Sequence, residues 1–318
     1  MTEVPQHVLK GKNTMTRKEI IQSLKGIFPP LVTPFNRRGE IDEGLFCENV
    51  QKLTGIGLAG VLVAGSSGEA PYLSEGERLR LVEIARPLVR PPEIVIAGVG
   101  LESTDATAKL GQEAVARGAD ALLVITPNYY KSKMDAETLA AHYRAVARQV
   151  ERPVIIYSIP QFSGLHLEPS TIHKLSRIPN VVALKESSGD LRFVRSVLRG
   201  VRAGFRVLVG SVAILYEALR AGAVGAVLSQ ADYAPELCVG LYQAFLQKKR
   251  KTALEFQERL LPLAGKVALP FGIPGIKAAA DLSGYAGGFP RAPLAPLGQA
   301  ERKLVAEALK EAHSGLQV

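Results

Sequence analysis

Eight short runs of apolar, largely β-branched residues recur along the chain, with longer segments of helical periodicity between them. The runs are Ile27–Thr33, Val61–Gly65, Ile94–Gly98, Ala121–Thr126, Val154–Ser158, Val181–Lys185, Arg206–Gly210 and Ala226–Ser229. Their starts lie about 20 to 34 residues apart, which is the spacing of strand–helix units. Runs without polar alternation are typical of strands buried on both faces of a parallel sheet. The pattern therefore predicts a parallel sheet of eight strands.

Two α/β architectures fit eight such units, a closed barrel and a doubly wound open sheet. A dinucleotide-binding open sheet would carry Gly-x-Gly-x-x-Gly after its first strand, and the chain has no such motif there. Eight strands that are each followed by a helical segment favour the barrel. We predict an α/β fold, a (β/α)8 TIM barrel with additional C-terminal helices.

The remaining segments are assigned around this barrel. We expect residues 1–25 to be an N-terminal extension with a short helix, 26–232 the barrel, and 233–318 a helical region packed on it. Thr16 with Glu19 and Ser74 with Glu77 have the spacing of helix capping boxes. The helices expected after the barrel are Glu236–Lys251, Ala253–Leu263 and Gln299–His313, with a Gly/Pro-rich connection over Pro270–Pro296.

Composition excludes several classes of function. The net charge of +9 is spread over helical segments, with one short cluster at Lys248–Lys251 and no basic patch with interleaved aromatic residues. We therefore expect no nucleic-acid partner, although anionic metabolites suit the charge. No apolar run reaches the roughly 18 residues of a membrane span, so we expect no membrane association.

The cysteines and histidines give information on the cellular compartment and on metal binding. Cys47 and Cys238 lie far apart in helical segments, and we interpret them as reduced packing residues of a reducing compartment. The five histidines form no His-x-x-x-His pair, so we predict neither a metal site nor a cofactor. The N-terminus, Met1 to about Asn13, lacks the apolar segment of a secretory signal. These features predict a cytoplasmic protein.

Lys185 closes the sixth apolar run, which reads Val-Val-Ala-Leu-Lys. A lysine is almost never fully buried unless it is paired or has a chemical role. Burial favours the neutral amine, which is a nucleophile toward carbonyl groups. The alternative is that the strand ends at Leu184 and that Lys185 points into water. The other strand ends decide between the two.

In a barrel the active site lies at the C-terminal ends of the strands, and several of these ends carry polar residues. The second run leads into Gly65-Ser66-Ser67-Gly68-Glu69, a turn that can direct hydroxyl and backbone N–H groups at a carboxylate. The other residues on this rim are Tyr129, Tyr130, Tyr157, Lys185, Gly210 and Ser211. A neutral lysine could attack a 2-oxo acid, the turn could hold the acid, and phenols could transfer protons.

These motifs, in this order, resemble the dihydrodipicolinate synthase/N-acetylneuraminate lyase family of class I aldolases, from about Gly26 to the C-terminus. The matching patterns are Gly-x-x-Gly-Glu at 65–69, Thr-Pro-x-Tyr at 126–129, Tyr-x-x-Pro at 157–160, and Lys185. The resemblance implies a pyruvate-type imine on Lys185, with Tyr157 as proton relay and Ser66 and Ser67 on the substrate carboxylate. It makes Lys185, Tyr157, Tyr129 and Ser66 the candidate catalytic residues.

The resemblance further implies a substrate-binding set that consists of Ser67, Gly65, Gly210, Val227 and Phe162. The family is typically a homotetramer, a dimer of tight dimers, and Tyr130 is expected to reach into a neighbouring subunit's site. Dihydrodipicolinate synthases usually carry an arginine where this chain has Phe162, and phenylalanine cannot make a bidentate carboxylate contact. The C-terminal stretch, Phe271–Lys277 with Arg291–Leu294, looks like that of 4-hydroxy-2-oxoglutarate aldolases.

Three hypotheses follow. The first is a lyase that cleaves 4-hydroxy-2-oxoglutarate to pyruvate and glyoxylate through an imine on Lys185. The second keeps the imine but changes the partner, to aspartate semialdehyde as in a dihydrodipicolinate synthase or to a sugar acid. The third is a barrel that binds a small acid without turnover. A pure binding protein has no need of the lysine, which favours the enzymes.

Overall fold

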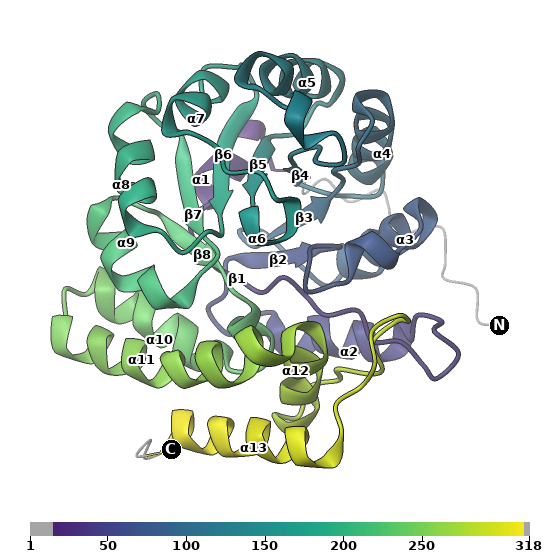
Figure 1. The fold of residues 1–318 in the computed structure, drawn as a ribbon, viewed down its shortest axis with the longest axis vertical. Coiled ribbons are helices and arrows are strands. Elements are labelled where there is room, and N and C mark those ends of the chain that lie inside the picture. Colours follow the sequence, from purple (N-terminus) through teal and green to yellow (C-terminus); the bar gives the residue numbers. More distant parts are fainter. Residues whose placement is uncertain (1–14, 315–318) are drawn as a thin grey trace.

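The computed structural model describes residues 15–314, and its centre is a ring of eight parallel strands (Figure 1). The strands are β1 (Gly26–Phe28), β2 (Gly60–Val63), β3 (Ile94–Gly98), β4 (Ala121–Ile125), β5 (Val154–Ser158), β6 (Val181–Glu186), β7 (Arg206–Val209) and β8 (Gly225–Val227). They pair in the order β1-β8-β7-β6-β5-β4-β3-β2. Hydrogen bonds of 2.9 Å from Ala59 N to Ile27 O and from Leu62 N to Pro29 O join the two ends. The predicted (β/α)8 barrel is confirmed.

Helices surround this ring on the outside (Figure 1). Between the strands lie α2 (Glu43–Leu53), α3 (Glu75–Ala85), α4 (Thr104–Ala116), α5 (Ala136–Gln149), α6 (Pro160–Ser163), α7 (Pro169–Leu175), α8 (Leu191–Gly200) and α9 (Leu215–Ala221). The predicted capping box of α3 is confirmed, because the Ser74 hydroxyl accepts from Glu77 N and the Glu77 carboxylate accepts from Ser74 N. Such caps satisfy the free N–H groups at a helix start.

Side chains alternate between two apolar clusters along each strand, because successive residues of a strand point to opposite faces. Leu62, Ile96, Leu123 and Ile155 belong to an inner cluster, while their strand neighbours belong to the larger core beneath the helices. Helix α1 (Arg17–Ser23), with the predicted Thr16–Glu19 capping box, contributes Ile20 to the inner cluster. It packs against the N-terminal ends of the strands, which leaves the C-terminal ends for the site.

The first strand is shorter than predicted. The apolar run was expected to be extended from Ile27 to Thr33, but β1 ends at Phe28. Two consecutive prolines, Pro29 and Pro30, follow it, and proline has no backbone N–H to donate to a strand neighbour. The chain then continues as a buried loop, since Leu31, Val32 and Thr33 are all at most 2% exposed.

The C-terminal region differs from the prediction in two places. Helix α10 (Pro235–Leu246) is followed by α11 (Arg250–Leu263), so the helix predicted over Glu236–Lys251 ends early. Lys248 adopts a left-handed conformation with φ 58°, which an α-helix cannot contain. The predicted connection over Pro270–Pro296 is also wrong in its first half, because α12 (Leu269–Leu282) occupies it.

Several of the prolines and glycines that suggested a connection lie within α12. Pro270 lies in the first turn of α12, directly after the π-helical turn η6 (Ala264–Ala268) that links α11 to α12. Gly272 has φ 53° and ψ −138°, so the helix is kinked just before Pro274. The predicted last helix, α13 (Gln299–His313), is confirmed. Apolar residues of α11, α12 and α13 belong to the same core as the outer faces of the strands.

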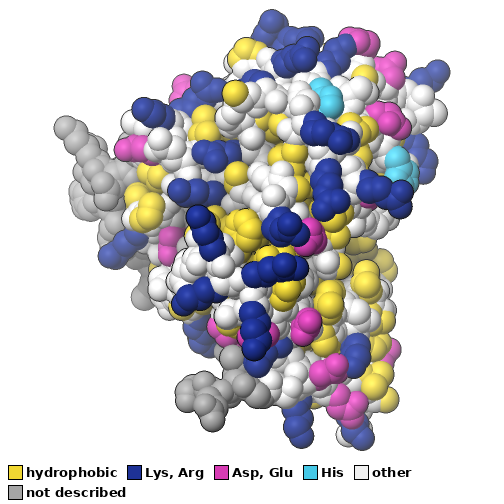
Figure 2. Space-filling view, turned by 90° about the vertical axis from the view of Figure 1, so that its left-hand side faces the viewer, with side chains coloured by type: hydrophobic (Ala, Val, Ile, Leu, Met, Phe, Trp, Pro, Cys, Tyr) yellow, Lys and Arg dark blue, Asp and Glu magenta, His cyan; other side chains and the backbone are white. Residues whose placement is uncertain are grey.

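The positive charge is distributed over the surface. Figure 2 shows one face on which Lys and Arg side chains are scattered from top to bottom among apolar and acidic groups. Many Lys and Arg side chains of the described chain pair with carboxylates, as Arg80 does with Glu43 at 2.7 Å. In the described part of the chain no helix is long and apolar enough to cross a membrane.

Candidate active site

Lys185 and Tyr157 lie side by side at the C-terminal end of the barrel. They are register partners on β6 and β5, and the Lys185 ammonium nitrogen lies 4.0 Å from the centre of the Tyr157 ring. Lys185 is only 4% exposed, so the alternative that it points into water is wrong. Burial lowers the pKa of Lys185 to about 7, and the charge of Asp232 opposes this shift. A large share of the amine is therefore neutral near pH 7.

The Tyr157 hydroxyl contacts the turn that follows β2. Its oxygen lies 3.1 Å from the Ser66 hydroxyl oxygen, and either group can donate the hydrogen bond. Burial raises the pKa of Tyr157 to about 12, while hydrogen bonds from Ser66 and Ser187 lower it. The phenol is thus protonated and positioned between the lysine and the turn, where it can pass a proton in either direction.

The turn from Gly65 to Glu69 is held by contacts from distant parts of the chain. The Thr33 hydroxyl donates to Gly68 O at 2.7 Å. The Glu69 carboxylate forms a buried ion pair with Lys277 of α12 at 2.5 Å and accepts from Arg291 N at 2.9 Å. Glu69 has φ 59°, a left-handed conformation that these contacts hold in place.

Gly65, Ser67, Gly210 and Val227 lie around this centre. Gly65 and Ser66 line one cavity with Tyr157. Ser67, the next residue in the sequence, is buried. Val227 belongs to the inner cluster of the barrel together with Tyr157. A Cβ at Gly210 would lie 1.9 Å from the Ser187 hydroxyl, so glycine permits the close approach of the loops after β6 and β7.

Three aromatic residues that the sequence singles out lie on the surface of this chain: Tyr129 and Phe162 of the predicted site, and Tyr130, which was expected to reach a neighbouring subunit. Tyr129 is 77% exposed, Tyr130 is 70% exposed and Phe162, on α6, is 66% exposed. The loop that carries both tyrosines is fixed by Glu102, whose carboxylate accepts from Asn128 N and Tyr129 N at 2.9 Å. The structure therefore does not bring Tyr129 or Tyr130 against Lys185 within this chain.

Two cavities meet at Ser66. One, of about 80 Å³, is lined by Ser66, Tyr157 and Arg78, and the other, of about 490 Å³, by Ser66, Arg78 and Phe162. Arg78 comes from α3 and donates to Ala70 O at 2.7 Å, while its Nε has no hydrogen-bond partner in the described chain. It provides a guanidinium next to the proposed carboxylate turn. Arg78 could not be recognised as a site residue from the sequence, because an arginine within a helix resembles a surface residue.

Asp232 is the second residue that the sequence analysis missed. It ends the turn η5 (Ser229–Asp232) after β8, is 2% exposed, and neither of its carboxylate oxygens has a hydrogen-bond partner in residues 15–314. Burial raises the pKa of Asp232 well above its ordinary value, and the Lys185 ammonium opposes this shift. Its position in the loop after the eighth apolar run was the available signal, since the loops that follow the strands form the rim on which Lys185 lies.

Known proteins are similar to almost the whole chain. The model of the dihydrodipicolinate synthetase family matches residues 23–312. The chain belongs to this family. Its members include the 4-hydroxy-tetrahydrodipicolinate synthase of Bartonella bacilliformis, 34% identical over 294 residues that are 92% of this chain and 99% of that protein. The synthase of Methanopyrus kandleri is 36% identical over 291 residues, 91% of this chain and 96% of that protein.

A solved structure of a family member is also similar to this chain. A prophage protein of the dihydrodipicolinic acid synthase family from E. coli, in complex with pyruvate, matches with a TM-score of 0.85 at 27% identity, covering 91% of this chain and 98% of that chain. As a dihydrodipicolinate synthetase family member, the protein is an enzyme of the class I aldolase type. The two relatives carry the synthase name, which agrees with the alternative of the sequence analysis rather than with the 4-hydroxy-2-oxoglutarate aldolase placed first.

Proposed function

We propose that the protein joins pyruvate to an aldehyde, or reverses this reaction, through a Schiff base on Lys185. The neutral Lys185 amine attacks C2 of pyruvate to give a carbinolamine, which loses water to form an iminium. Loss of a C3 proton then gives an enamine, and its C3 attacks the aldehyde carbon to form the new carbon–carbon bond. Water finally hydrolyses the imine and releases the product. The buried lysine with its lowered pKa is the observation that carries the proposal.

The other residues of the site have roles that fit these steps. The Tyr157 hydroxyl can give a proton to the carbinolamine hydroxyl, which then leaves as water, and can take a proton back during hydrolysis, with Ser66 as the next member of the relay. Ser66 and Ser67 lie in the turn proposed to hold the pyruvate carboxylate. Because the turn is fixed through Glu69, it can hold the acid with little reorganisation.

The names of the relatives make aspartate semialdehyde the first candidate for the aldehyde, as in a 4-hydroxy-tetrahydrodipicolinate synthase. Its carboxylate would require a cation, and Arg78 is the cationic side chain that lines both described cavities at Ser66. Glyoxylate is the second candidate, as in a 4-hydroxy-2-oxoglutarate aldolase. Phe162 favours it, since the chain has no arginine at the position where synthases usually carry one.

The test begins with the imine itself. Borohydride reduction of the pyruvate-treated enzyme should attach a stable adduct to Lys185, identified by peptide mass spectrometry, and Lys185→Ala should give none. A folded wild type that gains no adduct contradicts the proposal. Turnover with pyruvate and a panel of aspartate semialdehyde, glyoxylate and sugar aldehydes then identifies the partner by the largest kcat/KM.

We also propose that the active form is a homotetramer in which the Tyr129–Tyr130 loop completes the site of a neighbour. The two rings pack edge to face with centroids 5.0 Å apart, and both are largely exposed in the single chain. Exposed aromatic pairs are typical of protein interfaces. Light scattering reports the mass in solution. If the loop acts between subunits, mixing a Tyr129→Ala/Tyr130→Ala double variant with Lys185→Ala should restore activity, whereas a loop acting within its own subunit would restore none.

A further inference from the structure

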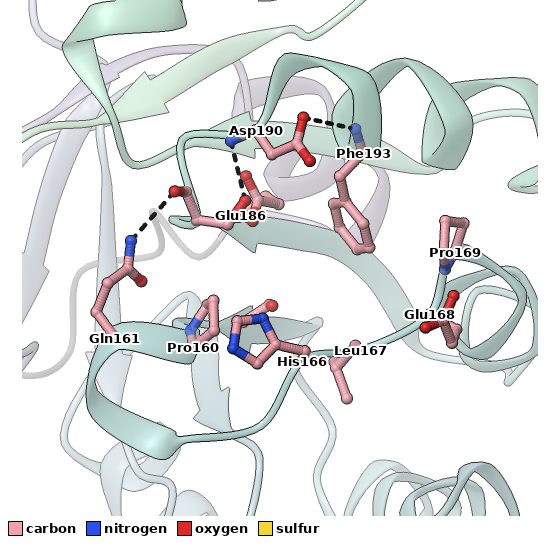
Figure 3. A pocket seen from close by; sticks show the side chains of 11 residues that line it. Pro160, Gln161, His166, Leu167, Glu168, Pro169, Glu186, Asp190 and Phe193 are labelled. Carbon is pink, nitrogen blue, oxygen red and sulfur yellow. Dashed lines mark hydrogen bonds between the residues drawn. The ribbon is translucent and has the colours of Figure 1, made fainter.

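A third cavity lies on the other side of strands β5 and β6 from Lys185. It has a volume of about 520 Å³, and α6, the segment 166–169 and the start of α8 surround it (Figure 3). Its wall contains Ser158 and Glu186 from the two strands, with Phe193 from α8. We call it the outer cavity. Neither Lys185 nor Ser66 lines it, so it is separate from the candidate active site.

The outer cavity is related to the active site by the alternation of the two strands. Tyr157 is paired with Lys185 and Ser158 with Glu186 in the register of β5 and β6. Because successive residues of a strand point to opposite faces, Tyr157 and Lys185 point into the barrel while Ser158 and Glu186 point outward. The same two strands therefore present the catalytic residues on one face and the floor of the outer cavity on the other.

Glu186 has an unsatisfied hydrogen-bonding group in this floor. Its side chain is fully buried, and one carboxylate oxygen, Oε1, accepts from Ser188 N at 2.7 Å. The other oxygen, Oε2, has no hydrogen-bond partner among residues 15–314. A buried carboxylate oxygen without a partner is costly, and burial raises the pKa of Glu186. The hydrogen bond to Ser188 thus uses only one of the two carboxylate oxygens of Glu186.

The remaining wall combines negative charge with apolar surface. Asp190 and Glu168 line the cavity with Glu186, and all three are labelled in Figure 3. Pro160, Leu167 and Phe193 contribute its apolar surface, while no lysine or arginine lines it in the described chain. This composition is unusual for a protein with a net charge of +9. It suits a ligand with a positive head and a short apolar body.

An organic cation fits this wall better than a metal ion does. Across residues 15–314 no three His, Cys, Asp or Glu side chains gather closely enough to hold a metal ion. His166 and Glu168 are exposed at the entrance, so a ligand can enter from solvent. An ammonium or guanidinium group would supply the hydrogen-bond donors that Glu186 lacks.

We propose that the outer cavity binds a small organic cation, a primary amine or guanidinium with a short apolar body, and that its charged head pairs with Glu186. Asp190 and Glu168 add negative potential near the head, and the ring of Phe193 lies against the body. This proposal is independent of the Schiff-base chemistry, because no step of that chemistry uses Glu186.

Isothermal titration calorimetry with agmatine and with n-alkylammonium ions of increasing length tests the proposal, with butanoate and butanol as matched anionic and neutral probes. We expect the cations to bind and the matched probes not to bind. Glu186→Gln keeps the shape of the side chain and should weaken cation binding about tenfold or more, because a hydrogen bond to a charged group is lost. Glu113→Gln, on the exposed face of α4, should bind as the wild type does.

Two further variants keep the result interpretable if Glu186→Gln folds poorly. Leu167→Trp narrows the cavity without touching Glu186 and should also abolish binding. Lys185→Ala should leave cation binding unchanged, since the active site lies on the opposite face of the strands. The proposal is overturned if no cation binds at millimolar concentration, if butanol binds equally well, or if binding disappears in Lys185→Ala.

Discussion

The Lys185 ammonium nitrogen lies 4.0 Å from the centre of the Tyr157 ring, and the two residues are paired across neighbouring strands. A cation over an aromatic face is attracted to it, yet burial of the amine disfavours its charge. Burial is the stronger effect, because the pKa of Lys185 is lowered to about 7. Near neutral pH the Lys185 amine is therefore partly protonated and partly neutral.

The rate of imine formation should therefore rise with pH and reach half its maximum near pH 7. Only the neutral amine attacks the carbonyl, and its fraction increases as the pH passes through the pKa of Lys185. An unperturbed lysine would give a midpoint near about 10.4. Borohydride trapping of the pyruvate adduct at a series of pH values measures the midpoint. A midpoint above pH 9 would show that the amine is not buried as described.

Asp232→Asn should move this midpoint to lower pH. The carboxylate of Asp232 favours the ammonium form of Lys185 and raises the pKa of Lys185. Without this carboxylate, burial lowers the pKa of Lys185 further. The same trapping experiment reports the shift, and Asp105→Asn serves as control because Asp105 pairs with Lys109 at the surface. An unchanged or higher midpoint in Asp232→Asn would contradict this electrostatic coupling.

Tyr157→Phe should lower kcat by about 10²–10⁴ while leaving the fold intact, because general acid–base catalysis typically contributes this factor. The substitution keeps the ring beside Lys185 and removes the hydroxyl that contacts Ser66. Steady-state turnover measures the effect. Ser66→Ala removes the other end of the same hydrogen bond and should raise the KM for pyruvate as well, since Ser66 lies in the turn proposed to hold the carboxylate. Wild-type turnover by Tyr157→Phe would exclude the relay.

The strands and the reactive lysine could be predicted because their signals are local. Each apolar run identifies one strand, and a lysine at the end of such a run is visible in the sequence itself. The roles of Asp232 and Glu186 could not be predicted, because their significance depends on which neighbours fail to supply a hydrogen bond. Helix α12 was missed for a different reason, since proline and glycine usually mark a connection, whereas here the helix contains both and is kinked at Gly272.

Phe162→Arg tests how the acceptor is chosen. Phe162 is 66% exposed beside the cavity that contains Ser66 and Arg78, so an arginine can replace it without disturbing the core. We expect the variant to gain kcat/KM toward aspartate semialdehyde by about tenfold or more, because each charge-assisted contact contributes about 1.5 kcal/mol or more. Phe162→Met, which adds no charge, is the matched control. An equal gain in both variants would show that the aromatic ring obstructs the site rather than that a cation is needed.

Lys277→Met should destabilise the protein and weaken pyruvate binding together. The side chains of Lys277 and Glu69 are each 1% exposed, and Lys277 also donates to Thr33 O and Phe289 O at 2.7 and 2.6 Å. Removing the lysine leaves the Glu69 carboxylate buried without its partner, which typically costs about 3–5 kcal/mol. Because Glu69 ends the turn that contains Ser66, the same change releases the proposed carboxylate site.

The double variant Lys277→Met/Glu69→Gln separates these two effects. It removes both charges, so urea unfolding should show a smaller loss of stability than in Lys277→Met alone. If Glu69 positions the turn, pyruvate affinity should remain low in the double variant even as stability returns, because glutamine cannot restore the ion pair that holds α12 against the turn. Affinity that recovers in parallel with stability would mean that the pair supports the fold alone.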